Sequence, residues 1–204
     1  KYKGWKRKPR ASRNVTSASS PSSGIYNFTT FLLSAIAILV VIVLREPLTE
    51  DFKLLPNAII LLTLVFSFIA LRNNRFFEKI LMNPYHISRN REYYRLFSSG
   101  FGHIDAGHFL LNMLGLYFFG EYLMRFLISA YPLNAPLAFI LIYLSAIVFS
   151  DLPDLIRHKN NPSYTAVGAS GAISAVIAGA AISDPSIQVY PFGIAVPGLL
   201  YAFG

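Results

Sequence analysis

Long apolar stretches without charge recur along the chain and predict its architecture. A helix needs about 20 apolar residues to cross the hydrocarbon core of a bilayer. Backbone polar groups find no water there, so stretches of this kind have to be helical. A period-two alternation is absent, which argues against an outer-membrane barrel. The pattern predicts six spans, at residues 28–44, 54–71, 107–127, 132–150, 165–183 and 187–204.

The composition supports a membrane protein. Apolar residues make up 54% of the 204 residues and charged residues only 14%, whereas about a quarter of the residues are charged in a typical soluble domain. The chain contains no Cys, which excludes disulfides and thiolate metal sites. The predicted fold class is therefore all-α, a polytopic bundle of transmembrane helices.

Charge divides the chain into three parts. Seven of the 18 Lys and Arg residues lie within the first 13 residues, and no acidic residue precedes Glu46. Residues 1–27 are predicted to be a basic, Ser-rich flexible arm, residues 28–53 an extra apolar segment with a short loop, and residues 54–204 the membrane domain. Anionic lipid headgroups and nucleic acid would both attract the arm. We favour a solvated tail and expect no nucleic-acid partner.

The linker at residues 72–106 is long for a membrane bundle and carries both charged and aromatic side chains. Long loops are usually functional or disordered. Its aromatic content is too high for a disordered segment, so we expect it to pack on the bundle.

The third predicted span begins with polar residues, whose burial in the hydrocarbon core costs free energy. His108 and Asn112 are four residues apart and therefore share one face of a helix. Polar residues inside a membrane usually face the bundle interior and indicate a functional site. The alternative is that they only join helices by hydrogen bonds. His103 lies off that face and is assigned a structural role in the loop.

Ser170 lies between small residues where the fifth predicted span begins. Gly168 and Gly171 flank it and allow close approach of another backbone, and the first N–H groups of a helix have no partner within the helix. Those groups could stabilise an oxyanion. The alternative is helix packing, because Gly171, Ala175 and Gly179 form a small-residue stripe at a spacing of four.

The two motifs together are more specific than either alone. Along residues 54–204 the chain resembles the rhomboid family of intramembrane serine proteases in the order and spacing of its motifs. The matching motifs are Tyr94-Arg95, Gly102-His103, His108-x-x-x-Asn112 and Gly168-x-Ser170-Gly171.

The resemblance implies a role for each matching residue. Ser170 corresponds to the family's nucleophile, and His108 and Asn112 to residues that help to hold the oxyanion. We expect Arg95, His103, Gly168 and Gly171 to support the site.

Two departures from the family pattern concern the general base. The family's base is a histidine two spans after the serine, whereas all four histidines here precede Ser170. The chain stops at Gly204 inside an apolar run, so we expect the helix with the base histidine to follow, outside this chain. Many relatives have an aromatic ring where Ser174 stands, which leaves the support of that histidine unassigned.

The activity implied by the resemblance is intramembrane serine endopeptidase. Its substrates would be transmembrane segments of other proteins, cleaved by a Ser-His dyad without metal or cofactor, and its location the bilayer, as a multi-pass protein of a bacterial inner membrane. One alternative is a catalytically inactive relative that binds membrane clients. Another is an unrelated transporter or channel, which predicts inverted internal repeats that the chain does not display.

Overall fold

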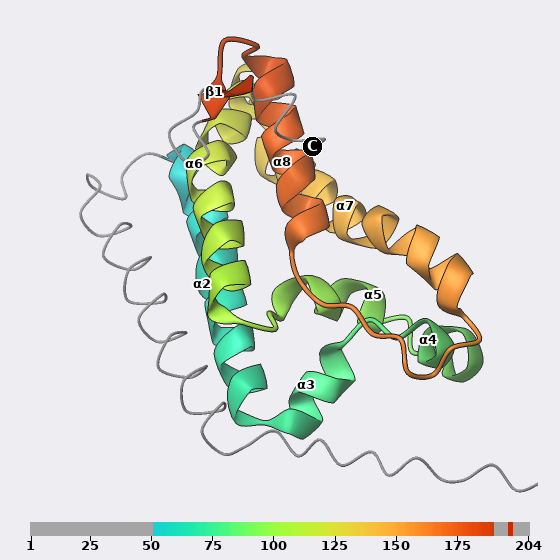
Figure 1. Ribbon diagram of the computed structural model, residues 1–204. Helices are drawn as coiled ribbons and strands as arrows, with labels where there is room; N and C mark the ends of the chain where they lie inside the picture. The colour runs from blue at the N-terminus through green and yellow to red at the C-terminus, as the bar shows by residue number, and fades with distance from the viewer. Residues whose placement is uncertain (1–50, 190–195, 198–204) are drawn as a thin grey trace, which may run out of the picture.

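The computed structural model describes residues 51–189 and 196–197, and within them it shows a helical bundle (Figure 1). The long helices are α2 (Asp51–Arg72), α6 (Ala106–Ala130), α7 (Ala135–His158) and α8 (Ser170–Ser183). Short helices connect α2 to α6, and a pair of two-residue strands follows α8. The all-α prediction is confirmed, since besides helix and coil the described residues form only these two short strands and one isolated bridge.

Helix α6 is the centre of the bundle and packs against α2, α7 and α8. Its buried face includes Phe109, Met113 and Leu116. Gly115 of α6 faces Ile173 of α8, because a Cβ atom on Gly115 would lie 2.8 Å from the Cγ2 atom of Ile173. Further along, Leu123 of α6 lies against Gly179 of α8 in the same way. The two helices therefore run parallel, and the loop that precedes α8 lies beside the first turn of α6 (Figure 1).

The linker 72–106 is folded, as its aromatic content predicts. It contains α3 (Asn74–Ile80), α4 (Pro84–Asn90), α5 (Arg95–Ser98) and the 3-10 helix η1 (Ser99–Phe101). Helices α4 and α5 contact α7, and η1 contacts α2. The linker thus covers the end of the bundle at which α6 and α8 begin.

Predicted and observed helix boundaries agree closely for α2 and α6 but differ for α7 and α8. Helix α7 continues to His158, eight residues beyond the predicted end, because the last turns tolerate charged side chains at the edge of the bundle. Helix α8 begins at Ser170 instead of residue 165. The backbone before it forms a bridge, in which Ala166 exchanges hydrogen bonds with Met82.

The predicted helix at 187–204 is wrong for the residues that the structure describes. Strand β1 (Gln188–Val189) pairs antiparallel with β2 (Val196–Pro197). Pro191 and Pro197 lack the N–H that a helix interior requires, and β-branched residues favour strands. The predicted span 28–44, the arm 1–27 and most of the segment 28–53 lie outside the described residues.

Two of the described helices have the length and composition to cross a membrane. They are Leu54–Arg72 of α2 and the whole of α7. Their outer faces carry exposed large apolar side chains, including Leu61, Val65, Leu141 and Phe149, as a lipid-facing surface requires. Helix α8 is apolar but has only 14 residues, or about 21 Å at 1.5 Å per residue.

Candidate functional site

The first two turns of α6 orient His108 and Asn112 towards the bundle. Asp105 is the N-cap of the helix, and its Oδ1 accepts a hydrogen bond from the His108 backbone N–H at 2.9 Å. A cap of this kind fixes the residue at which a helix begins. Asn112 is 6% exposed, and His108 is half-buried.

Ser170 is the first residue of α8, and its side chain is exposed. The N-cap, Ala169, provides no side-chain hydrogen bond. The first N–H groups of α8 therefore have neither an intrahelical acceptor nor a capping side chain. These donors and the positive end of the helix dipole lie where a negative charge beside Ser170 would be stabilised.

Gly168 brings the serine loop against His108. Its φ of +134° lies in a region that L side chains rarely adopt. Its N–H donates to the Ser99 carbonyl oxygen at 2.9 Å. A Cβ atom at this position would lie 3.1 Å from His108 Nε2 and would collide with Cε1 of the same ring. The imidazole of His108 thus packs on the backbone two residues before Ser170.

His103 connects α2 to α6 beneath this contact. It is 1% exposed. Its Nε2 atom lies 3.1 Å from Asn112 Nδ2, and its Nδ1 atom lies 3.1 Å from Ser67 Oγ. The hydrogen bond to His103 therefore fixes the orientation of the Asn112 side chain. The Nδ2 group has a second hydrogen, which remains for another acceptor. The sequence assigned His103 only to the loop, because Ser67 lies 36 residues away in the chain.

The hydrogen bonds of Ser67 determine which His103 nitrogen carries the proton. Ser67 Oγ donates its single hydrogen to the Phe101 carbonyl oxygen at 3.2 Å, so it accepts from Nδ1–H of His103. Nε2 then accepts from the Asn112 amide. Burial, followed by the electrostatic interaction with His108, lowers the pKa of His103 to about 3. His103 is therefore neutral at physiological pH, as this arrangement requires.

Arg95 holds the linker together. Its side chain is 8% exposed, and its Nε donates to Glu92 Oε2 at 2.6 Å. Its Nη1 donates to the backbone oxygens of Glu78 and Leu81 at 2.7 and 2.9 Å. These contacts satisfy carbonyl groups at the C-terminal end of α3. The hydrogen bonds from Arg95 and Asn90 hold the pKa of Glu92 below its ordinary value.

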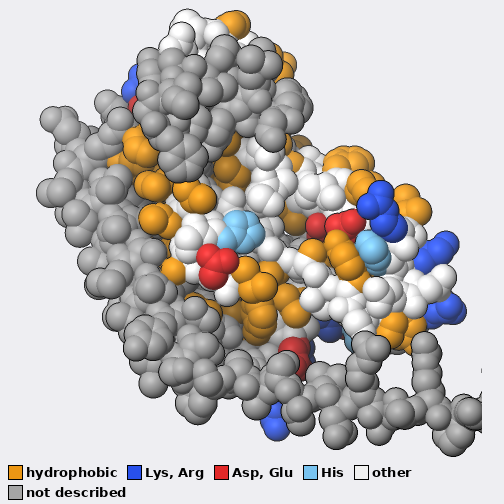
Figure 2. Space-filling model, in the orientation of Figure 1, with side chains coloured by type: hydrophobic (Ala, Val, Ile, Leu, Met, Phe, Trp, Pro, Cys, Tyr) orange, Lys and Arg blue, Asp and Glu red, His pale blue; other side chains and the backbone are white. Residues whose placement is uncertain are grey.

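A polar cavity of about 300 Å³ opens beside Ser170. It lies between the first turns of α8 and the last turns of α7. Its lining residues are Ser99, Ser150, Asp151, Asp154, Ala166, Val167, Gly168, Ser170, Gly171 and Ser174. The sequence analysis did not propose Asp151 and Asp154 as site residues, because they simply follow the end of the apolar run at residue 150. Figure 2 shows acidic side chains next to histidines on this face of the molecule.

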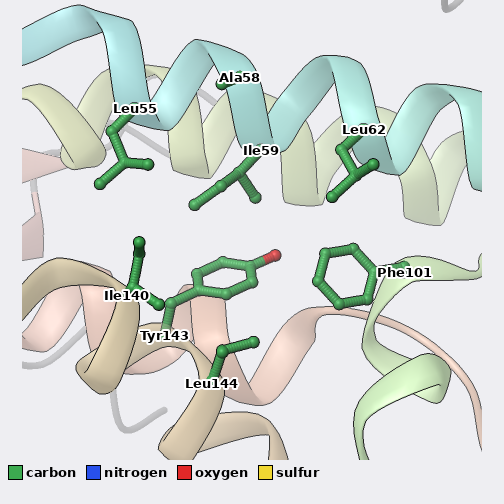
Figure 3. Close-up of a pocket in the computed structure, with 8 residues that line it drawn as sticks. All are labelled: Leu55, Ala58, Ile59, Leu62, Phe101, Ile140, Tyr143 and Leu144. Atoms are coloured by element: carbon green, nitrogen blue, oxygen red, sulfur yellow. The ribbon is translucent and has the colours of Figure 1, made fainter. Parts of the chain in front are cut away.

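A second cavity has a different character and lies away from Ser170. It has a volume of about 290 Å³ and lies between α2 and α7 (Figure 3). Apart from the Tyr143 hydroxyl, the side chains that line it are apolar, and they include Leu55, Ile59, Phe101 and Leu144. Among the described residues that line it there is no carboxylate, serine or histidine, so peptide chemistry is not expected there.

The geometry at Ser170 can support acyl transfer. Such a reaction requires a nucleophile, a base and donors for the developing oxyanion. The described residues place the Ser170 hydroxyl at the start of α8, with the N–H groups of its first turn, and the His108 ring against the backbone of Gly168, two residues earlier. Within the described part of the chain, no hydrogen bond from Ser170 to a basic side chain is present.

Comparisons with known proteins agree with the resemblance seen in the sequence. Residues 90–203 match the profile of the rhomboid domain. The chain is 33% identical over 138 residues to RHOMBOID-like protein 12, mitochondrial, of Arabidopsis thaliana, an alignment that covers 61% of this chain and 41% of that protein. The chain thus spans about two fifths of the length of this curated relative. No solved structure matches.

Replacement of His103 by Ala is expected to destabilise the protein. It leaves the buried Asn112 amide without its His103 acceptor, at a cost of about 1–3 kcal/mol, whereas the Ser67 hydroxyl keeps its hydrogen bond to the Phe101 carbonyl oxygen. The measurement is thermal unfolding of the purified protein in detergent. The matched control is His86→Ala, because His86 lies on an exposed part of the linker. Equal melting temperatures for the two variants would contradict the bridging role of His103.

Proposed function

The chain belongs to the rhomboid family, and on this premise we propose that it is an intramembrane serine endopeptidase with Ser170 as its nucleophile. The observation that carries the proposal is the packing of the His108 ring against Gly168, two residues before Ser170. Helices α6 and α8 are far apart in sequence, and this contact joins their two motifs. The family and its apolar helices make the protein an integral membrane protein with a rhomboid-like bundle.

In the proposed reaction, Ser170 Oγ attacks the scissile carbonyl carbon and loses its proton to a base. Membership of the family implies a histidine as this base. The base would return the proton to the leaving amine, and water would then release the acyl group from the serine. No acidic third member is invoked, so the catalytic unit is a dyad.

The proposed oxyanion site combines backbone and side-chain donors. The Ser170 N–H at the start of α8, the His108 ring and the remaining Asn112 amide hydrogen would donate to the tetrahedral oxygen. Pre-oriented donors are effective because they need no reorganisation during the reaction. The hydrogen bond between Asn112 and His103 provides that orientation for the amide.

The proposed substrates are transmembrane segments of other proteins. An intact helix hides its carbonyl groups in backbone hydrogen bonds. The segment therefore has to unwind locally before Ser170 can reach the peptide bond, and Gly or Pro near the cleavage position would favour this. A rhomboid-like chain without activity would bind the same segments and leave them intact.

We propose a mitochondrial membrane as the location. The expected bacterial inner membrane gains no support, because the relative named above is a mitochondrial protein. The N-terminal arm is basic and Ser-rich, and it precedes the first acidic residue, Glu46. Arg- and Ser-rich segments poor in acidic residues are typical of mitochondrial transit peptides.

Ser170→Ala is expected to abolish cleavage of a single-span substrate, because the variant lacks the attacking hydroxyl. The measurement uses full-length protein and substrate in liposomes, with product detected by electrophoresis. A fluorophosphonate probe should label the wild type and not the variant. Ser183→Ala, at the opposite end of α8, is the matched control. It should still cleave the substrate and still be labelled by the probe. Cleavage by Ser170→Ala at the wild-type rate would refute the proposal, whereas an intact substrate with the wild type would favour the inactive alternative.

Asn112→Ala is expected to reduce kcat by about 100–1,000-fold, the usual effect of removing one oxyanion donor. The same liposome assay under saturating substrate measures it. Asn134→Ala is the control, since the Asn134 side chain makes no capping hydrogen bond at the start of α7. A normal kcat for Asn112→Ala would exclude Asn112 from the oxyanion site.

Residues 1–27 are expected to direct a fluorescent reporter to mitochondria when placed after an initiator methionine. Imaging against a mitochondrial dye measures the location. The control replaces the seven Lys and Arg residues at positions 1–13 by Gln, which removes the positive charge. A wild-type fusion that stays in the cytosol would contradict the proposed targeting role.

A further inference from the structure

Asp151 lies in the cavity that Ser170 lines and has no role in the proposed reaction. The cavity volume of about 300 Å³ is much larger than the roughly 30 Å³ occupied by one water molecule. One wall contains Ser170 and Gly171 of α8, and the opposite wall contains Ser150 and Asp151 of α7. A substrate bound at Ser170 would therefore have one side chain next to this carboxylate.

Gly171 allows this close approach of the two helices. A Cβ atom at Gly171 would collide with the Ser150 side chain and would lie 3.4 Å from the Ala146 carbonyl oxygen. Any larger residue after the nucleophile would move α8 away from α7. The glycine that follows Ser170 thus brings the carboxylate of α7 to the serine.

The carboxylate of Asp151 lacks a cationic partner within the part of the chain that the structure describes. Its Oδ2 accepts a hydrogen bond from Ser99 Oγ at 3.2 Å, and no Lys, Arg or His of these residues pairs with it. The residue is half-buried. Partial burial of an unpaired carboxylate is costly, and a bound cation would offset that cost.

Asp154 is less available than Asp151 for such a role. Its Oδ2 accepts a hydrogen bond from the Tyr164 hydroxyl at 2.5 Å, and its Oδ1 lies 4.0 Å from His158 Nε2. These contacts hold its carboxylate towards the loop after α7. Its negative charge still adds to that of Asp151 and favours a positive group in the cavity.

We propose that Asp151 forms a substrate subsite that selects a basic side chain, Arg or Lys, at the residue whose carbonyl Ser170 attacks. The inference rests on the proposed peptidase function. A guanidinium or ammonium group in the cavity would pair with Asp151, and the remaining donors would meet the hydroxyls of Ser150 and Ser174 and the Asp154 carboxylate. Basic residues commonly flank transmembrane segments, so suitable side chains occur near the ends of such substrates.

The test compares two single-span substrates that differ only at the residue before the cleaved bond, which is Arg in one and Met in the other. With the full-length wild-type protein in liposomes, kcat/KM should be about tenfold or more higher for Arg, as expected for a hydrogen-bonded charged pair. Asp151→Asn should bring the ratio close to one and still cleave the Met substrate. Asp151→Glu keeps the charge and should retain the preference for Arg.

Asp184→Asn is the matched control, because it removes one exposed carboxylate at the far end of α8; its ratio should equal that of the wild type. Should Asp151→Asn fail to fold, Asp151→Ser replaces it, since a hydroxyl can still accept from Ser99. A wild type that cleaves both substrates equally, or an Asp151 variant with an unchanged ratio, would overturn the subsite and leave the peptidase proposal intact. A wild type that cleaves neither substrate would overturn both.

Discussion

The buried polar groups at the start of α6 form their hydrogen bonds with one another, because little water reaches them inside the bundle. The His103 imidazole pairs with Ser67 of α2 on one side and with Asn112 of α6 on the other. Each of these groups would be costly if buried alone. Together they join two helices at the level where the serine loop arrives, and His108 then supports that loop from the same helix. The site is thus built from groups whose buried hydrogen bonds also hold the helices together.

Much of this arrangement follows from the order of apolar and polar residues. The charge-free runs predicted α2 and α6 within a few residues, and the spacing of His108 and Asn112 placed both on one helix face. The start of α8 was predicted five residues early, since hydropathy does not register the positive φ that Gly168 adopts just before the helix. The strands after α8 were missed because apolar content alone does not distinguish helix from strand.

Long-range partners are the part that the sequence could not provide. Ser67 is one of many hydroxyl residues, and only the folded bundle places it against His103. Asp151 ended a charge-free run and was treated as a boundary, but α7 continues past it and turns it towards α8. The close contact of Gly171 with Ser150 produces this neighbourhood. In each case the role of a residue follows from a contact with another helix, which the sequence alone did not predict.

The shortness of α8 has a geometric consequence for access to the serine. A helix of about 21 Å is shorter than a hydrocarbon layer of about 30 Å. If its C-terminal end reaches one boundary of that layer, Ser170 lies about 9 Å below the opposite boundary. The hydroxyl is then recessed within the cavity that Ser99 of the linker, the last turns of α7 and the loop before α8 line. For the proposed reaction, a peptide bond would reach the hydroxyl only from a segment that bends down into this cavity, so depth itself would protect intact membrane helices.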